Sequence, residues 1–209
     1  GKSNLYRALQ LVTELASGRF IASLARAGGL SSVLWAGPEH VSSGMRRGDV
    51  PVQGTGSRKA PISLSVGFAS DDLGYLADIG LPPPMPMQTM FGRDPELKRE
   101  HVWSGPVLRP AALLIERRRS QIRVRGSDGW QPVGLQLGTR SSLLSELADP
   151  TLAPELLTLR HRVRGWRCHD SFRVDAHAPA RQPCPGTFTQ VLADDGHDLA
   201  PAVQTILES

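Results

Sequence analysis

The chain has 209 residues, about 40% of them hydrophobic and 21% charged, which is ordinary for a soluble globular protein. Its formal net charge of +4 rests almost entirely on guanidinium groups, since 21 arginines stand beside 3 lysines. This mild excess permits nucleic-acid binding without requiring it. No apolar run approaches the roughly 18 residues that span a bilayer, and no signal peptide is visible, so we expect a cytoplasmic location without membrane contact.

The first part of the chain has the spacing of a helix. Residues 2–27 place apolar side chains three and four positions apart, with an interruption at Gly18 and an end at Gly28-Gly29. The side chains expected on the buried face of the first segment are Leu5, Ala8, Leu9, Val12, Leu15 and Ala16.

The middle of the chain predicts short strands joined by turns. Residues 62–69 alternate between apolar and other residues, and residues 74–81 can pair with them across a turn at Asp71-Asp72. Residues 112–116 and 121–125 predict a second hairpin. Further strands are predicted at 32–36, 101–104 and 130–135, with an exposed loop or hairpin tip at 42–60. Together these segments indicate an antiparallel meander.

The last part of the chain returns to helical patterns. Ser141 or Ser142 can cap a short helix that runs through Leu147, and Pro154 can open a second one that runs through Val163. Three further elements are predicted: a strand at 166–174, a proline-rich connector at 176–187, and a helix over 199–207 capped by Asp198. We therefore expect three parts, namely residues 1–27, a strand-rich lobe over 30–140, and a mixed region over 141–209.

The tripeptide Gly1-Lys2-Ser3 carries the clearest chemistry. It matches the last three residues of the phosphate-binding P-loop, G-x-x-x-x-G-K-[ST], and it leads directly into the predicted helix. Backbone N–H groups at a helix N-terminus attract phosphate. Gly1 would let the backbone approach the phosphates, Lys2 would reach them as a point charge, and the Ser3 hydroxyl would hold Mg²⁺. The alternative is a surface tripeptide that merely starts a helix, with Ser3 as its cap.

The sequence that follows the tripeptide resembles a known family. Residues 1–9, Gly-Lys-Ser-Asn-Leu-Tyr-Arg-Ala-Leu, are similar to the P-loop and following helix of RecF-like, ABC-type predicted ATPases, within the AAA family ATPase group of P-loop NTPases. Later stretches that resemble the same group are residues 32–37, 94–100, 147–150, 166–173 and 194–200.

This resemblance implies a fold and an activity. The chain would be an α+β fragment of an α/β P-loop NTPase, cut at both ends, with a helix after the P-loop, an antiparallel sheet lobe, and two or three further helices. ATP and Mg²⁺ would bind at Gly1, Lys2, Ser3 and Asn4, and two copies of the full protein would close head to head on two ATP molecules. Whether DNA is a further partner is left open.

Several parts of such an ATPase are missing from this sequence. The strand and glycines before Gly1, the signature motif and the catalytic carboxylate are not found, so we expect the fragment to be inactive alone. Asp194-Asp195 is better interpreted as a loop leading into a helix than as the catalytic Walker B pair. Gln190 and Gln204 are both candidates for the glutamine of the Q-loop.

A second function class is a non-catalytic module that binds nucleic acid through arginines. The candidates are Arg117, Arg118, Arg119, Arg123 and Arg125 in the second hairpin, and Arg160, Arg162, Arg164 and Arg167 near the late helix. The simpler interpretation of both groups is a solvated surface, with Arg160 and Arg164 on the exposed face of their helix. His169, Asp170, Asp175 and His177 lack a convincing set of metal ligands.

Overall fold

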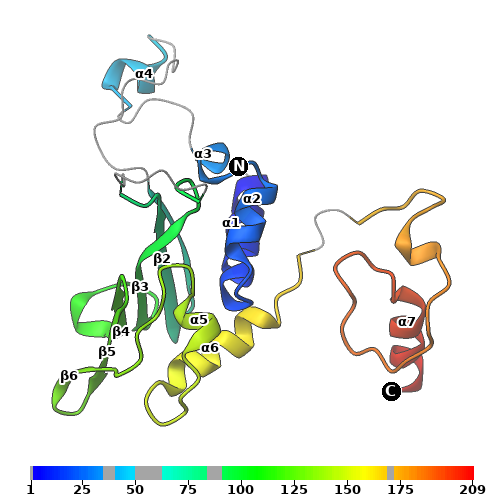
Figure 1. Cartoon of the computed structure of the whole chain (residues 1–209). Helices are drawn as coiled ribbons and strands as arrows, with labels where there is room; N and C mark the ends of the chain where they lie inside the picture. The colour runs from blue at the N-terminus through cyan, green and yellow to red at the C-terminus, as the bar shows by residue number, and fades with distance from the viewer. Residues whose placement is uncertain (1, 35–40, 50–62, 84–90, 169–171) are drawn as a thin grey trace. The chain divides into compact units, whose positions relative to one another are not determined.

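The computed structural model describes residues 2–34, 41–49, 63–83, 91–168 and 172–209. By their internal contacts the residues form two compact units, one over Arg7–Arg164 and one of Gly1–Tyr6 with Gly165–Ser209. Each unit is described by itself below (Figure 1).

The predicted helical start is confirmed. Helix α1 covers Lys2–Ala16 and helix α2 covers Phe20–Arg26. Gly18 separates them with a left-handed φ of +71°, and Gly28 and Gly29 end α2 with φ values of +89° and +88°. Such angles favour glycine because it has no Cβ.

The buried face of α1 differs from the predicted one at its start. Leu11, Val12, Leu15 and Ala16 are buried, whereas Leu5 is 64% exposed. Periodicity identifies the helix, but it cannot show how far along the helix its neighbours reach.

Two predictions after α2 are wrong. Residues 32–33, expected in a strand, lie in the four-residue helix α3, Leu30–Val33, where Ser32 Oγ donates a hydrogen bond to the carbonyl of Gly28 at 2.8 Å. Part of the expected loop forms helix α4, Ser43–Arg47, which is capped by the Ser42 hydroxyl and ended by Gly48. At α4 the Ser42 cap and the left-handed Gly48 favour one helical turn over extended chain. Residues 35–36 and 50–60 of these two segments lie outside the described residues.

The antiparallel meander is confirmed. Six strands pair in chain order, each antiparallel to the next. Their bounds are β1 Ser63–Ala69, β2 Leu73–Gly80, β3 Glu96–Ser104, β4 Leu113–Arg118, β5 Gln121–Gly126 and β6 Gly129–Pro132. Strand β3 is longer than the predicted 101–104 because its first half is rich in charged residues, which hide a strand from a hydrophobicity pattern.

One face of this sheet forms the core of the larger unit, and we call it the inner face. Its buried side chains are Val66, Tyr75, Ala77, Ile79, Val102, Ile115, Ile122 and Val124. Helices α5, Leu143–Glu146, and α6, Pro154–Arg164, lie on this side (Figure 1), where α6 contacts both α5 and β2. Both helices were predicted, and Ser142 is the cap of α5.

The predicted solvent-facing role is wrong for Arg160, which is half-buried, whereas Arg164 is exposed as predicted but also bonds within the protein. Arg160 donates hydrogen bonds to the carbonyls of Leu144 and Leu147 at the end of α5, and Arg164 donates to the carbonyl of Ala16 at the end of α1. The last carbonyls of a helix have no partner within it, and a cationic group nearby satisfies them and complements the helix dipole. The two arginines therefore join α6 to its neighbours.

Replacing Arg160 by alanine is expected to lower the free energy of unfolding by about 1–2 kcal/mol, because two buried carbonyls lose a charged donor. Replacing the neighbouring His161, which is exposed, should change the free energy by less than about 0.5 kcal/mol. Urea denaturation followed by circular dichroism measures both. Equal effects of the two substitutions would contradict the capping role.

The smaller unit contains helix α7, Leu199–Glu208, which confirms the predicted last helix. Asp198 occupies the cap position, but its carboxylate accepts from the backbone N–H of Ala193 rather than from the helix. The predicted strand at 166–174 is wrong for residues 166–168 and 172–174, which are irregular. A strand needs a partner for its backbone groups, and the described part of this unit contains no strand that could supply one.

Two short 3-10 helices complete the fold, at Pro110–Ala112 and Pro179–Arg181. The second of them lies within the predicted proline-rich connector. No helix among the described residues is both long enough and apolar enough to cross a membrane.

Candidate nucleotide-binding end of helix α1

The residues predicted to bind nucleotide lie at the start of α1. The helix begins at Lys2, and Ser3 and Asn4 follow in its first turn with exposed side chains. Gly1 and the side chain of Lys2 lie outside what the structure describes. The predicted helix is thus confirmed from Lys2 onward, while the binding roles of these four residues stay predictions.

The first turn of α1 has the electrostatic character that a phosphate needs. It contains no acidic residue, and the only carboxylate of the helix is Glu14, near the other end, which pairs with Arg19 at 3.1 Å. The first N–H groups of a 15-residue helix have no acceptor inside the helix and carry partial positive charge. Nothing in this turn therefore repels an anion.

The same turn fits the chemistry of magnesium bound to a nucleotide. Mg²⁺ prefers oxygen ligands and usually keeps several waters, taking one or two ligands from the protein and others from phosphates. The exposed hydroxyl of Ser3 can supply one such oxygen. No group of three or more His, Cys, Asp or Glu that could hold a metal by itself occurs among the described residues, so a cation at Ser3 would depend on the phosphates.

The acidic pair in the smaller unit lies in a loop. Asp194 and Asp195 follow irregular chain and precede α7, as predicted. The carboxylate of Asp195 is 2.7 Å from the His197 ring. This hydrogen bond lowers the pKa of Asp195 and raises the pKa of His197. The Walker B interpretation thus lacks the strand that it needs.

The two glutamine candidates have different surroundings. Gln204 lies in α7 and donates a hydrogen bond to the carboxylate of Glu208, and Gln190 lies in a bend of the irregular segment before it. Neither position tests the Q-loop prediction.

The group of His and Asp residues considered as metal ligands is only partly described. The Asp175 carboxylate accepts from Arg173 and from the His177 backbone, while His169 and Asp170 lie outside the described residues.

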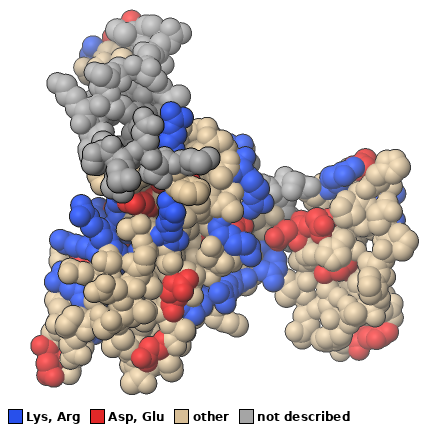
Figure 2. Space-filling view, viewed as in Figure 1, with Lys and Arg blue, Asp and Glu red and all other residues tan. Residues whose placement is uncertain are grey.

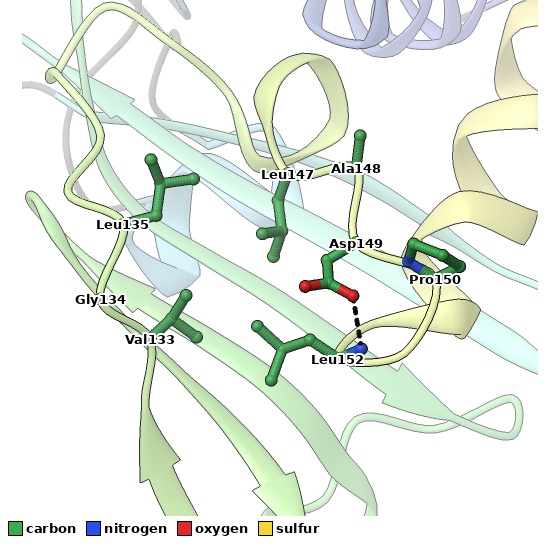
Figure 3. Close-up of a pocket in the computed structure, with 8 residues that line it drawn as sticks. All are labelled: Val133, Gly134, Leu135, Leu147, Ala148, Asp149, Pro150 and Leu152. Atoms are coloured by element: carbon green, nitrogen blue, oxygen red, sulfur yellow. Dashed lines mark hydrogen bonds between the residues drawn. The ribbon is translucent and has the colours of Figure 1, made fainter.

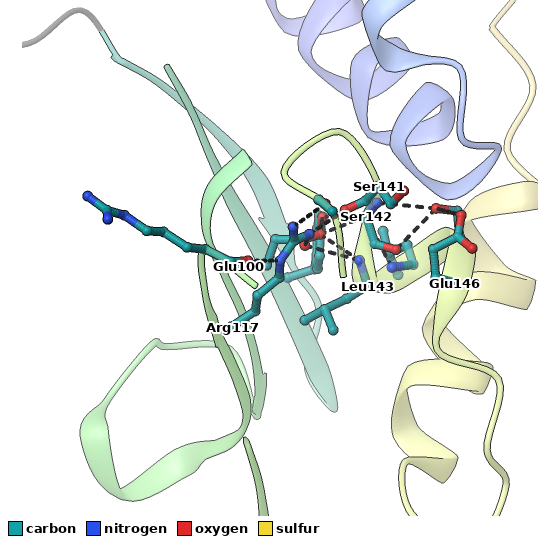
Figure 4. Close-up of polar contacts among 11 residues, drawn as sticks. Glu100, Arg117, Ser141, Ser142, Leu143 and Glu146 are labelled. Atoms are coloured by element: carbon teal, nitrogen blue, oxygen red, sulfur yellow. Dashed lines mark hydrogen bonds and ion pairs between the residues drawn. The ribbon is translucent and has the colours of Figure 1, made fainter. Parts of the chain in front are cut away.

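A buried charged cluster was not predicted from the sequence. Arg117 and Glu100 are both fully buried and form an ion pair at 2.6 Å (Figure 4). The Glu100 carboxylate also accepts from the Tyr75 hydroxyl at 2.6 Å, from the Ser142 hydroxyl at 2.6 Å and from the backbone N–H of Leu143 at 3.0 Å. Burial and this carboxylate together raise the pKa of Tyr75. The cluster joins the inner face of the sheet to the first turn of α5.

The remaining donors of Arg117 are satisfied inside the protein as well. They bond to the carbonyls of Arg119, Ser141 and Gly138. With every polar group engaged and no exposed surface, the cluster offers nothing to a ligand and stabilises the fold. The interpretation of the second hairpin as a uniformly solvated arginine surface is therefore wrong at Arg117.

An open pocket lies between the end of β6 and the turn from α5 to α6 (Figure 3). It is lined by Val133, Gly134, Leu135, Leu147, Ala148, Asp149, Pro150 and Leu152. Its one carboxylate, that of Asp149, accepts from the backbone N–H groups of Thr151 and Leu152, both at 2.9 Å. The acidic group thus holds its own turn, and the pocket has little chemistry to offer.

No protein-family model, curated protein or solved structure matches this chain. The assignment of a function therefore depends on the residues and their geometry.

Proposed function

We propose that this chain is part of the ATP-binding head of a RecF-like, ABC-type ATPase, with Gly1, Lys2, Ser3 and Asn4 at the phosphates. The supporting observation is that a 15-residue helix begins at Lys2, within the Gly-Lys-Ser sequence, and that its first turn is free of acidic residues and exposed at Ser3 and Asn4. A helix followed by an antiparallel sheet also agrees with the lobe that the resemblance implies.

Each residue of the turn has a distinct role in this proposal. The backbone N–H groups bind phosphate oxygens, and the Lys2 ammonium neutralises their charge. The Ser3 hydroxyl oxygen holds Mg²⁺, which when bound withdraws charge from the phosphates during transfer to water. The proposal gives no described residue the role of activating the water. Turnover therefore requires further residues of the full protein, and two heads closing on two ATP molecules would be one way to complete the site.

The first test is the gene sequence upstream of Gly1. A P-loop needs a preceding strand and the start of the G-x-x-x-x-G-K-[ST] pattern. Their presence, together with a signature motif and an acidic strand end downstream, is the expected result. A different upstream sequence would remove the basis of the proposal.

The second test is nucleotide binding by the full-length protein, measured by titrating a fluorescent ATP analogue with Mg²⁺. Lys2→Ala is expected to weaken binding by about 10–100-fold, the worth of a charge-assisted contact. Arg26→Ala, which removes an exposed cation from α2, is the matched control and should leave binding unchanged. The 209-residue chain alone should bind weakly at best and hydrolyse no ATP, and substantial hydrolysis would contradict this assignment of parts.

A further inference from the structure

The face of the sheet opposite the inner face, the outer face, carries two rows of residues in register across the strands, and their charged residues lie on β2 to β5. The first row, in register from β1 to β5, is Ser65, Asp78, Arg99, Arg118 and Gln121. The second row is Gly67, Leu76, His101, Glu116 and Arg123. Figure 2 shows Lys and Arg side chains gathered at the left edge of the sheet unit, beside β3 and β4.

The carboxylates of these rows lie beneath the arginines. Asp78 is 10% exposed and pairs with Arg99, which is 50% exposed. Glu116 is 4% exposed and pairs with Arg118 and Arg123, which are 68% and 48% exposed. The negative groups are therefore covered, and the surface presented to water is formed by guanidinium groups that the ion pairs hold in place.

Two of these guanidinium groups stand directly opposite each other. Arg99 on β3 and Arg118 on β4 are cross-strand partners. Like charges in this relation destabilise a sheet, and here the ion pairs with Asp78 and Glu116 offset the repulsion. The arginines of this face outnumber these two carboxylates, so an excess of positive charge is left for phosphates; they are Arg99, Arg118, Arg123 and Arg125. Protection of a sheet edge does not explain them, since edge strands carry that role and both β3 and β4 are interior strands.

An aromatic ring continues the same face on the last strand. The Trp130 ring has its centroid 5.0 Å from the guanidinium carbon of Arg123, and Trp130 pairs in register with Arg125. Trp130 is 36% exposed. A base can stack on such a ring while phosphates bind the neighbouring arginines, which is the arrangement used for single strands.

We infer that the outer face binds single-stranded nucleic acid, with its phosphates on Arg99, Arg118, Arg123 and Arg125 and a base on Trp130. The single strand is favoured over a duplex because the bases of a duplex are stacked on each other and leave no open ring face for Trp130. This site is independent of the nucleotide site proposed at α1.

The test is binding of a fluorescently labelled oligothymidine of about 20 nucleotides to the full 209-residue chain, measured by anisotropy at several salt concentrations. The double variant Arg99→Gln/Arg118→Gln is expected to bind about tenfold or more weakly and to show a shallower dependence on salt, because fewer counterions are released. Trp130→Ala should weaken binding about tenfold, and Trp130→Phe should restore most of it.

Two controls make the result decisive. Arg26→Gln, which removes an exposed cation from α2, should leave oligonucleotide binding unchanged. Thermal unfolding should show that the double variant is folded. The inference would be overturned by absence of binding to the unmodified chain, by equal losses in Arg26→Gln and the double variant, or by equally tight binding of a duplex of the same length.

Discussion

Replacement of Arg117 by methionine is expected to lower the free energy of unfolding by about 3–5 kcal/mol. Methionine fills a similar volume, so the loss comes from charge rather than from a cavity. The Glu100 carboxylate would remain fully buried with its cationic partner gone, and three carbonyls would lose their donor. Urea denaturation monitored by circular dichroism measures the loss.

Two comparisons separate this effect from a general loss of arginine. Arg125→Met removes an exposed guanidinium from β5 and should cost less than about 1 kcal/mol. The double variant Glu100→Met/Arg117→Met removes both charges, so its loss should be smaller than the sum of the single losses. Additive losses would show that the two groups do not depend on each other.

Replacement of Gly67 by alanine is expected to cost about 3 kcal/mol, at the upper end of the range for overpacked sites. A Cβ at Gly67 would lie 2.2 Å from the backbone oxygen of Tyr75 and 2.9 Å from the Cα of Leu76. Both atoms belong to the backbone of β2, the paired strand, so they cannot move aside as a flexible side chain could. The pairing of β1 with β2 would have to shift.

Gly134→Ala is the matched control for this substitution. A Cβ at Gly134 would meet nothing within 4 Å, so this variant should be as stable as the parent or slightly more so. Both variants can be compared by urea denaturation, and amide hydrogen exchange can show whether the Gly67 variant opens β1 first. Wild-type stability of Gly67→Ala would contradict the close approach of the two strands.

The meander could be predicted because its information is local. The alternation of Leu64, Val66 and Phe68 predicts a strand with one buried face. The turn at Asp71-Asp72 is also local, since the Asp72 carboxylate accepts from the Ser70 hydroxyl and the Leu73 backbone. Helix starts were predicted for the same reason, as the cap of α5 at Ser142 shows.

The wrong predictions lie in segments whose structure is decided by groups outside the segment itself. Residues 32–33 have strand-like side chains, yet the glycines before them and the Ser32 hydroxyl favour a helical turn. Residues 172–174 also have a strand-like pattern, but the described residues of their unit include no strand with which they could pair. Pairing depends on residues distant in sequence, which a local pattern does not contain.

By itself the sequence determined most of the helices, the antiparallel meander and the chemical character of the first turn of α1, because each depends on neighbours along the chain. Only the tertiary structure decided the roles of the arginines. Arg117 is buried on Glu100, Arg160 caps α5, and Arg118 remains on the open outer face. Identical side chains differ in role because burial and the nearest acceptor are set by strands and helices brought together from distant parts of the chain.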